Sequence, residues 1–274
     1  MGECAYFLVP ARRKDAIGNL RIAFKGEKTE AEIRAIARGM FRNLGEDLFE
    51  ILSASKLTFR NIDRHVRVRG LEIVDKALSQ KRGFIVLSAH FGNWELLAAA
   101  FGLKGYKGLV LARRIYYEPY NRWIVGLRLS AKVPTLYRND ASREVLKRLR
   151  GGEIVGIVPD QDIDSLKGVF VPFFGRPAYT ALAPARLALA SGAPIIPAFL
   201  VRTGPGRYRM IAGRVLRASQ MSDRDEAAAA LTREWMAEFE KVIRLYPEKW
   251  ACLHRRWKTK PKDIRNEREV LLAS

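Results

Sequence analysis

The sequence has little cysteine and little histidine. Its 274 residues include two cysteines near opposite ends, Cys4 and Cys252, which are too few for a disulfide scaffold or a cysteine-rich zinc site. A reduced, cytosol-facing location is therefore the expectation. The three histidines are His65, His90 and His254, and a Gly-x-Ser-x-Gly nucleophile motif is absent.

Long apolar runs are also lacking. No window approaches the roughly 18 to 20 consecutive apolar residues that a membrane-spanning helix requires. The first ten residues, MGECAYFLVP, are apolar, but the basic residues Arg12, Arg13 and Lys14 follow them. A secretory signal places its charges before the apolar stretch, so this segment is not one. We interpret it as a peripheral membrane contact or the stub of a missing N-terminal anchor.

Positive charge is abundant. The sequence carries 49 Lys and Arg against 29 Asp and Glu, a formal net charge of +20, which predicts an anionic partner. No zinc-finger, basic-zipper or RRM signature accompanies these residues, so we expect no nucleic acid partner. An anionic membrane surface attracts each nearby Lys or Arg by about 1 kcal/mol, so we favour such a surface as the anionic partner. A generally solvated basic exterior is the alternative.

Short apolar runs alternate with helical patterns along the chain, which predicts an α/β fold with a mainly parallel central sheet and helices on both faces. Thr29 and Glu32 form a capping-box pattern at the start of a long amphipathic helix. We treat residues 1–274 as a single domain with a basic tail from about 258 to 274. The expected strands are 83–89, 109–112, 135–137, 154–158 and 194–201, with 208–212 as an antiparallel sixth. The expected helices are 75–79, 94–102, 119–129, 141–150 and 179–190, with added terminal helices at 29–52 and 223–245.

Two details of this expectation concern proline and aromatic residues. The prolines of the 194–201 strand predict a place near the edge of the sheet, because proline donates no ladder hydrogen bond. Residues 170–175 are expected to belong to a long loop that leads to the helix at 179–190.

His90 directly follows the buried strand 83–89, where the carboxyl ends of parallel strands bind ligands. Residues five apart on a regular helix point about 140° away from each other. For Glu95 to contact His90, the histidine must therefore lie in the strand-to-helix turn and Glu95 in the first helical turns. Gly92 gives the backbone freedom for that turn.

An imidazole backed by a carboxylate acts as a general base with a fixed tautomer. Because no serine or cysteine nucleophile motif is present, this base is expected to activate a hydroxyl group of the substrate. The alternative is purely structural: His90 caps the helix, and Glu95 interacts with the helix dipole.

Residues 88–95, SAHFGNWE, resemble the signature of the bacterial lipid A biosynthesis acyltransferases. That family lies within the lysophospholipid acyltransferase superfamily, with its His-x4-Asp/Glu motif. Further blocks of the sequence resemble the family in the same order: Arg114 with Pro119, PDQD at 159–162, GVFVPFFG at 168–175, SGAP at 191–194 and HRRWK at 254–258. The resemblance covers residues from about 6 to 258, and the ordered set is far more specific than any one block.

The resemblance implies a glycerolipid-acyltransferase-like fold and acyl transfer from a thioester donor, acyl carrier protein or acyl-CoA, to a glycolipid hydroxyl. It assigns His90 as the base and Glu95 as its partner. Arg114 and Arg113 would hold an anionic substrate group, and Asp160 and Asn93 would line the substrate site. The oxyanion would be held by backbone N–H groups of the 90–94 turn or by a nearby cation. No cofactor and no metal is expected.

The resemblance also implies a location at the cytoplasmic face of the bacterial inner membrane. Two alternatives stay open at this point. One is the same chemistry on another acceptor, such as a phosphoinositide mannoside, an ornithine lipid or a lysophospholipid. The other is a non-catalytic basic protein that binds membranes or nucleic acid.

Overall fold

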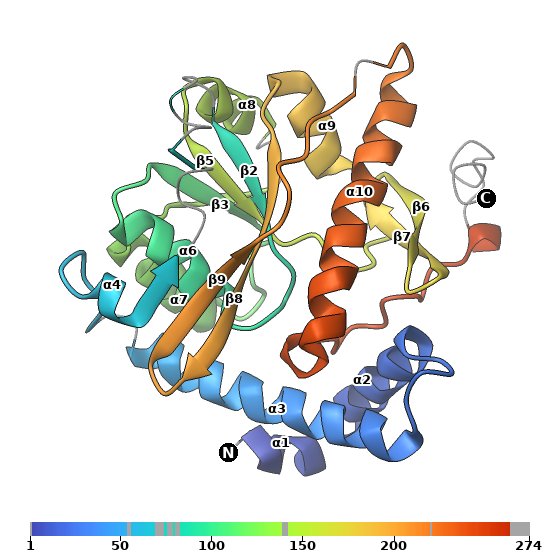
Figure 1. Ribbon diagram of the computed structural model, residues 1–274. Helices are drawn as coiled ribbons and strands as arrows, with labels where there is room; N and C mark the ends of the chain where they lie inside the picture. Colours follow the sequence, from blue (N-terminus) through green and yellow to red (C-terminus); the bar gives the residue numbers. More distant parts are fainter. Residues whose placement is uncertain are drawn as a thin grey trace.

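A seven-stranded sheet forms the centre of the structure, a computed structural model that describes residues 2–53, 56–68, 74–75, 79, 83–138, 142–219 and 221–263. Its strand order is β1-β9-β8-β2-β5-β3-β4 (Figure 1). β8, β2, β5, β3 and β4 run parallel, whereas β9 is antiparallel to β8. The strands are β1 (Val66–Val68), β2 (Phe84–Leu87), β3 (Gly108–Ala112), β4 (Thr135–Tyr137), β5 (Ile154–Ile157), β8 (Ile195–Gly204) and β9 (Arg207–Ala212).

Helices cover both faces of this sheet, which confirms the predicted fold class. In Figure 1, α6 and α7 lie on one side of the strands and α9 and α10 on the other, while α3 lies beside α1 and α2. The helices are α1 (Gly2–Leu8), α2 (Pro10–Ala23), α3 (Glu30–Ser53), α4 (Ile62–His65), α6 (Trp94–Leu103), α7 (Glu118–Ser130), α8 (Ser142–Arg150), α9 (Ala183–Ser191) and α10 (Arg224–Leu245). No helix within these described ranges combines the length and the apolarity needed to cross a bilayer.

The alternation of side chains along β2 divides the interior into two cores. Phe84 and Val86 belong to a cluster with Leu96, Leu97 and Ala100 of α6. The intervening Ile85 and Leu87 join a larger cluster that contains buried residues of α2, α3, α8, α9 and α10. Successive strand residues point to opposite faces, so a continuous apolar run is what a strand with both faces covered requires.

The predicted capping box is present at the start of α3. The Thr29 N–H donates to Glu32 Oε2 over 2.8 Å, and the Glu32 N–H donates to Thr29 Oγ1 over 3.3 Å. The antiparallel strand expected at 208–212 is β9. Of the helix expected at 75–79, residues 76–78 lie outside the described residues, as do residues 264–274 of the basic tail.

Two expectations about local structure are wrong. Residues 170–175 are not part of a loop but belong to a separate hairpin, β6 (Gly168–Phe173) with β7 (Arg176–Ala181), so the following helix begins at Ala183 rather than at 179. Phe170 and Phe173 are fully buried. Apolar residues on both strands of the hairpin give the segment a core contact that its turn-like sequence did not reveal.

The strand containing Pro197 is not at the edge of the sheet: β8 lies between β9 and β2. The N–H and C=O of a strand residue point to the same side, so the missing N–H of Pro197 faces the β9 side, just beyond Ala198 and Ala212, where that pairing ends. Its carbonyl still accepts a hydrogen bond from the Gly213 N–H at 2.8 Å. Proline is therefore tolerated because the ladder loses no donor that a neighbour needs.

Candidate active site

His90 lies in the turn between β2 and α6, as predicted. Gly92 has a φ of +51°, and a Cβ added there would lie 2.0 Å from the Leu200 carbonyl oxygen, so only glycine fits. Asn93 is the N-cap of α6, and its side chain accepts a hydrogen bond from the Leu96 N–H at 2.9 Å. The helix begins at Trp94, which places Glu95 in its first turn.

Segments distant in the sequence hold this turn in place. The His90 carbonyl accepts a hydrogen bond from the Ala251 N–H at 2.7 Å, and the Gly92 N–H donates to the Lys249 carbonyl at 2.9 Å. The backbone around the imidazole is therefore fixed by hydrogen bonds on both sides.

Asp160 is the carboxylate that contacts His90. It follows β5, the parallel neighbour of β2, and its Oδ1 lies 2.6 Å from His90 Nδ1. Its Oδ2 accepts from the His90 N–H at 3.1 Å and from Trp250 Nε1 at 3.3 Å. Asp160 is buried, whereas the His90 side chain keeps 27% of its surface exposed. The pair leaves His90 Nε2 as the outward-facing nitrogen, with the Gln161 amide nitrogen 3.4 Å away.

Burial and charge act in opposite directions on this pair. Burial disfavours the imidazolium, but the Asp160 carboxylate and, more weakly, Glu95 raise the pKa of His90 above its ordinary value. Burial likewise disfavours the Asp160 carboxylate, yet the contact with His90 leaves the pKa of Asp160 below its usual range. Asp160 is thus an anion that stabilises the protonated imidazole.

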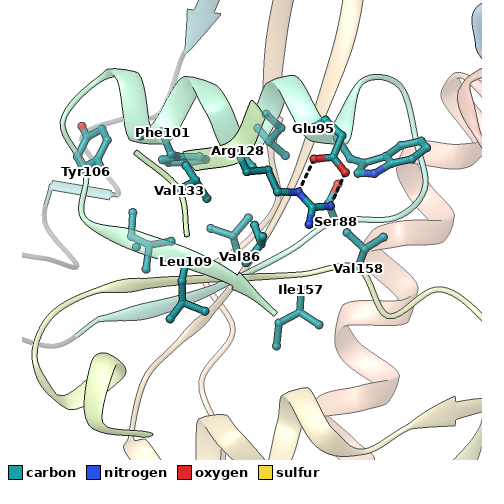
Figure 2. A pocket seen from close by; sticks show the side chains of 18 residues that line it. Val86, Ser88, Glu95, Phe101, Tyr106, Leu109, Arg128, Val133, Ile157 and Val158 are labelled. Carbon is teal, nitrogen blue, oxygen red and sulfur yellow. Dashed lines mark hydrogen bonds and ion pairs between the residues drawn. The ribbon is translucent and has the colours of Figure 1, made fainter. Parts of the chain in front are cut away.

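Glu95 does not pair with His90, which corrects the prediction of a direct contact. Its two carboxylate oxygens accept from Arg128 of α7, with distances of 2.7 Å to Nε and 2.6 Å to Nη2 (Figure 2). Both side chains are largely buried, with 9% of Glu95 and 14% of Arg128 exposed. A carboxylate offsets the cost of burying the Arg128 cation, and the planar guanidinium binds it with two hydrogen bonds, so this pairing dominates.

The other predicted substrate-binding residues have contacts with groups other than His90. Asn93 is buried, and in addition to its capping bond it donates to Glu50 Oε2 at 3.2 Å. Glu50 in turn accepts from Arg202 at 3.0 Å. Arg114 is exposed and pairs with Glu118 of α7 at 3.0 Å. The neighbouring Arg113 is also exposed.

A cavity lies beneath α6, and its empty space of about 630 Å³ includes a part that is open to solvent. The Glu95–Arg128 pair and Ser88 lie toward one end of it, and Tyr106 lies at the other (Figure 2). Its walls between these ends are mostly apolar side chains of β2, β3, β5 and α6. His90 is not among the lining residues, but Trp94 is, and its ring packs edge-to-face on the imidazole with centroids 5.0 Å apart.

Sequence reasoning missed Arg128 and the pairing role of Asp160. Arg128 gave no signal, because it is one of two arginines on the predicted helix 119–129 and nothing in the sequence distinguishes it as the buried one. Asp160 was expected to line the site, since it follows a predicted strand at its carboxyl end, but only the sheet shows that this strand, β5, lies next to β2. Within the described ranges, no group of three or more His, Cys, Asp or Glu side chains is placed to bind a metal ion.

Comparison with known proteins shows a family match and several similar enzymes. Residues 1–259 match the family described as "Bacterial lipid A biosynthesis acyltransferase". The chain is 31% identical to the lipid A biosynthesis lauroyltransferase of Escherichia coli (strain K12) over 268 residues, covering 96% of this chain and 85% of that protein. It is 28% identical to the lipid A biosynthesis palmitoleoyltransferase of the same organism, covering 95% and 83%. A phosphatidylinositol mannoside acyltransferase of Mycobacterium tuberculosis is 27% identical over 219 residues, covering 78% and 66%.

Proposed function

Because this chain belongs to the bacterial lipid A biosynthesis acyltransferase family and is an acyltransferase, we propose that it transfers a fatty acyl chain from a thioester to a hydroxyl of a lipid A precursor or similar glycolipid. The observation that carries the proposal is the His90–Asp160 pair, located beside a largely apolar cavity at the carboxyl ends of parallel strands.

His90 is the general base of the proposed reaction. With Nδ1–H donating to Asp160, Nε2 carries the lone pair that accepts the proton of the acceptor hydroxyl. The hydroxyl oxygen then forms a bond to the thioester carbonyl carbon, and the carbon–sulfur bond breaks as the tetrahedral intermediate collapses. The imidazolium returns its proton to the departing thiolate, so no net proton is gained or lost.

Asp160 and Glu95 have different tasks in this scheme. Asp160 fixes the tautomer and stabilises the imidazolium through a direct hydrogen bond. Glu95 contributes a more distant negative charge to His90, and its main contact secures Arg128 at the end of the cavity. General-base assistance of this kind contributes about 10²- to 10⁴-fold to a rate.

The cavity beneath α6 is proposed to hold the acyl chain. The tail would run from Ser88 and Glu95 toward Tyr106, between Val86, Leu109 and Phe101 (Figure 2). Each methylene that leaves water for such a wall contributes about 0.8 kcal/mol. The reactive carbonyl would then lie at the Trp94 end, next to His90.

The charge of the protein suits the remaining partners. An acidic acyl carrier protein as donor (or acyl-CoA), a phosphorylated lipid acceptor and an anionic leaflet are all attracted by a net charge of +20. Tyr116 and Tyr117, beside Arg113 and Arg114, are strongly exposed. Tyrosine and arginine together suit the headgroup region of a membrane. We therefore propose action at the cytoplasmic face of the inner membrane.

The proposal is tested by transfer from labelled acyl carrier protein, or acyl-CoA, to a panel containing a lipid A precursor, a phosphatidylinositol mannoside, an ornithine lipid and a lysophospholipid. The wild type should acylate the lipid A precursor fastest. His90→Ala should fold normally and lose transfer at least 100-fold. His65→Ala, which alters a histidine outside the site, is the control and should keep full activity. A fully active His90→Ala protein would reject the assignment.

A further inference from the structure

Ser88 is a buried polar residue that the proposed mechanism does not use. It immediately follows β2 and is 4% exposed. Its Oγ is buried and has no hydrogen-bond partner in the described part of the chain. Leaving a buried hydroxyl unpaired costs about 1 to 3 kcal/mol, so its presence requires a reason.

The position of Ser88 supplies a candidate reason. The residue lines the cavity beneath α6, and Figure 2 shows it at the end where Glu95 and Arg128 lie, opposite Tyr106. Trp94, next to Glu95 in the chain, also lines the cavity, and its ring contacts His90. A ligand with an apolar tail toward Tyr106 would place its polar head within this region.

Three of the five backbone donors expected to stabilise an oxyanion, those of residues 90–92, are already engaged. In the turn after β2, the N–H of His90 donates to Asp160. The next two N–H groups donate to the carbonyls of Ala89 and Lys249. These bonds also hold the turn in place, so the turn cannot release them without losing its shape.

The nearby cation is engaged as well. Arg128 donates twice to Glu95, and its Nη1 donates to Thr135 Oγ1 at 3.3 Å. Ser88 is therefore a cavity-lining donor that is free of such commitments.

We propose that the Ser88 hydroxyl donates a hydrogen bond to the carbonyl oxygen of the acyl thioester and to the oxyanion that forms from it. This inference rests on the proposed function. Ser88 forms no covalent bond: the oxygen of the acceptor attacks, His90 takes the proton, and Ser88 stabilises the negative charge on the former carbonyl oxygen. The bond strengthens as that charge develops, so it acts on the rate more than on binding.

The test compares Ser88→Ala with the wild type in steady-state transfer from a saturated acyl thioester. Loss of one oxyanion donor lowers kcat by about 10²- to 10³-fold, with little change in KM for the donor. Thermal unfolding should show an unchanged or higher melting temperature, because the variant no longer buries an unpaired hydroxyl. Ser88→Thr keeps the hydroxyl and should recover most of kcat. Ser191→Ala, at the end of α9 and outside the cavity, is the matched control.

A second measurement detects the contact directly. In a His90→Ala background, which blocks turnover, the infrared carbonyl stretch of a ¹³C-labelled bound thioester should lie at lower frequency with Ser88 than with Ser88→Ala. An unchanged frequency, or an unchanged kcat in Ser88→Ala, overturns the inference.

The remaining outcomes distinguish failure of the role proposed for Ser88 from failure of the proposed function. A loss confined to donors with a hydroxylated acyl chain would overturn the carbonyl contact and assign Ser88 to the chain hydroxyl instead. A wild type that transfers no acyl group from any thioester would refute the proposed function itself. An active wild type with an equally active Ser88→Ala variant refutes the role of Ser88 alone.

Discussion

Replacing Asp160 with asparagine should disable the base while preserving its surroundings. Asparagine has the shape of aspartate but no charge, and its amide can keep each of the contacts seen at Asp160. Its oxygen can accept from the His90 N–H and from Trp250 Nε1, the two donors that now share Oδ2. The amide NH₂ then faces His90 Nδ1, which must accept a hydrogen bond instead of donating one.

That reversal moves the ring proton to Nε2. In this tautomer the nitrogen facing the substrate carries a hydrogen and cannot take the proton of the acceptor. The corresponding change in serine proteases lowers kcat by about 10⁴-fold, which corresponds to about 5.4 kcal/mol of activation free energy. We expect a loss of this order for Asp160→Asn, with a folded protein.

The pH profile provides the more specific measurement. In the wild type, activity should rise with pH as His90 loses its proton, at a pH above that of an ordinary histidine, because Asp160 raises the pKa of His90. Without the carboxylate charge the imidazolium is less stable, so the remaining activity of Asp160→Asn should begin its rise at lower pH. The assay is kcat against pH with purified enzyme, combined with ¹⁵N NMR of the ring nitrogens.

Asp162→Asn is a suitable control. Asp162 is buried in the same loop, but its carboxylate accepts from the Thr259 N–H and hydroxyl rather than from His90. That variant should lose stability and keep the wild-type pH profile. The role given to the His90–Asp160 bond would be refuted if Asp160→Asn retained near wild-type kcat. It would also be refuted if kcat of this variant rose with pH over the same range as in the wild type.

Two further predictions concern the cavity. Glu95→Gln leaves the buried Arg128 cation without its carboxylate and should lower the free energy of unfolding, measured by urea titration, by about 3 to 5 kcal/mol. A Glu95→Leu/Arg128→Leu double variant should restore most of that loss. A Glu95→Gln protein as stable as the wild type would contradict the importance of the pair. Ala98→Phe fills part of the cavity and should lower kcat/KM by about 4-fold for each methylene of the acyl chain that it excludes. The measurement compares donors of increasing acyl-chain length. An unchanged preference for acyl-chain length would show that the cavity is not the acyl site.

The local structure around His90 was predictable because its causes are local. A continuous apolar run specifies a strand covered on both faces, and Gly92 allows the sharp turn that follows. Glu95 fell in the first turn of the next helix as expected. The capping box at Thr29 and Glu32 was equally readable, since both of its hydrogen bonds span three residues.

The pairing of the charged groups was decided only by the tertiary structure. His90 and Asp160 are 70 residues apart and meet because β2 and β5 are neighbours in the sheet, an order that the chain sequence does not state. Glu95 was assigned to His90 because the two are close in sequence. In the fold, Arg128 offers Glu95 two charge-assisted hydrogen bonds from a helix 33 residues away, and a buried arginine cannot be left without a partner. Residue types and their order fixed what the site contains, whereas the order of strands and the burial of each charge fixed which groups touch.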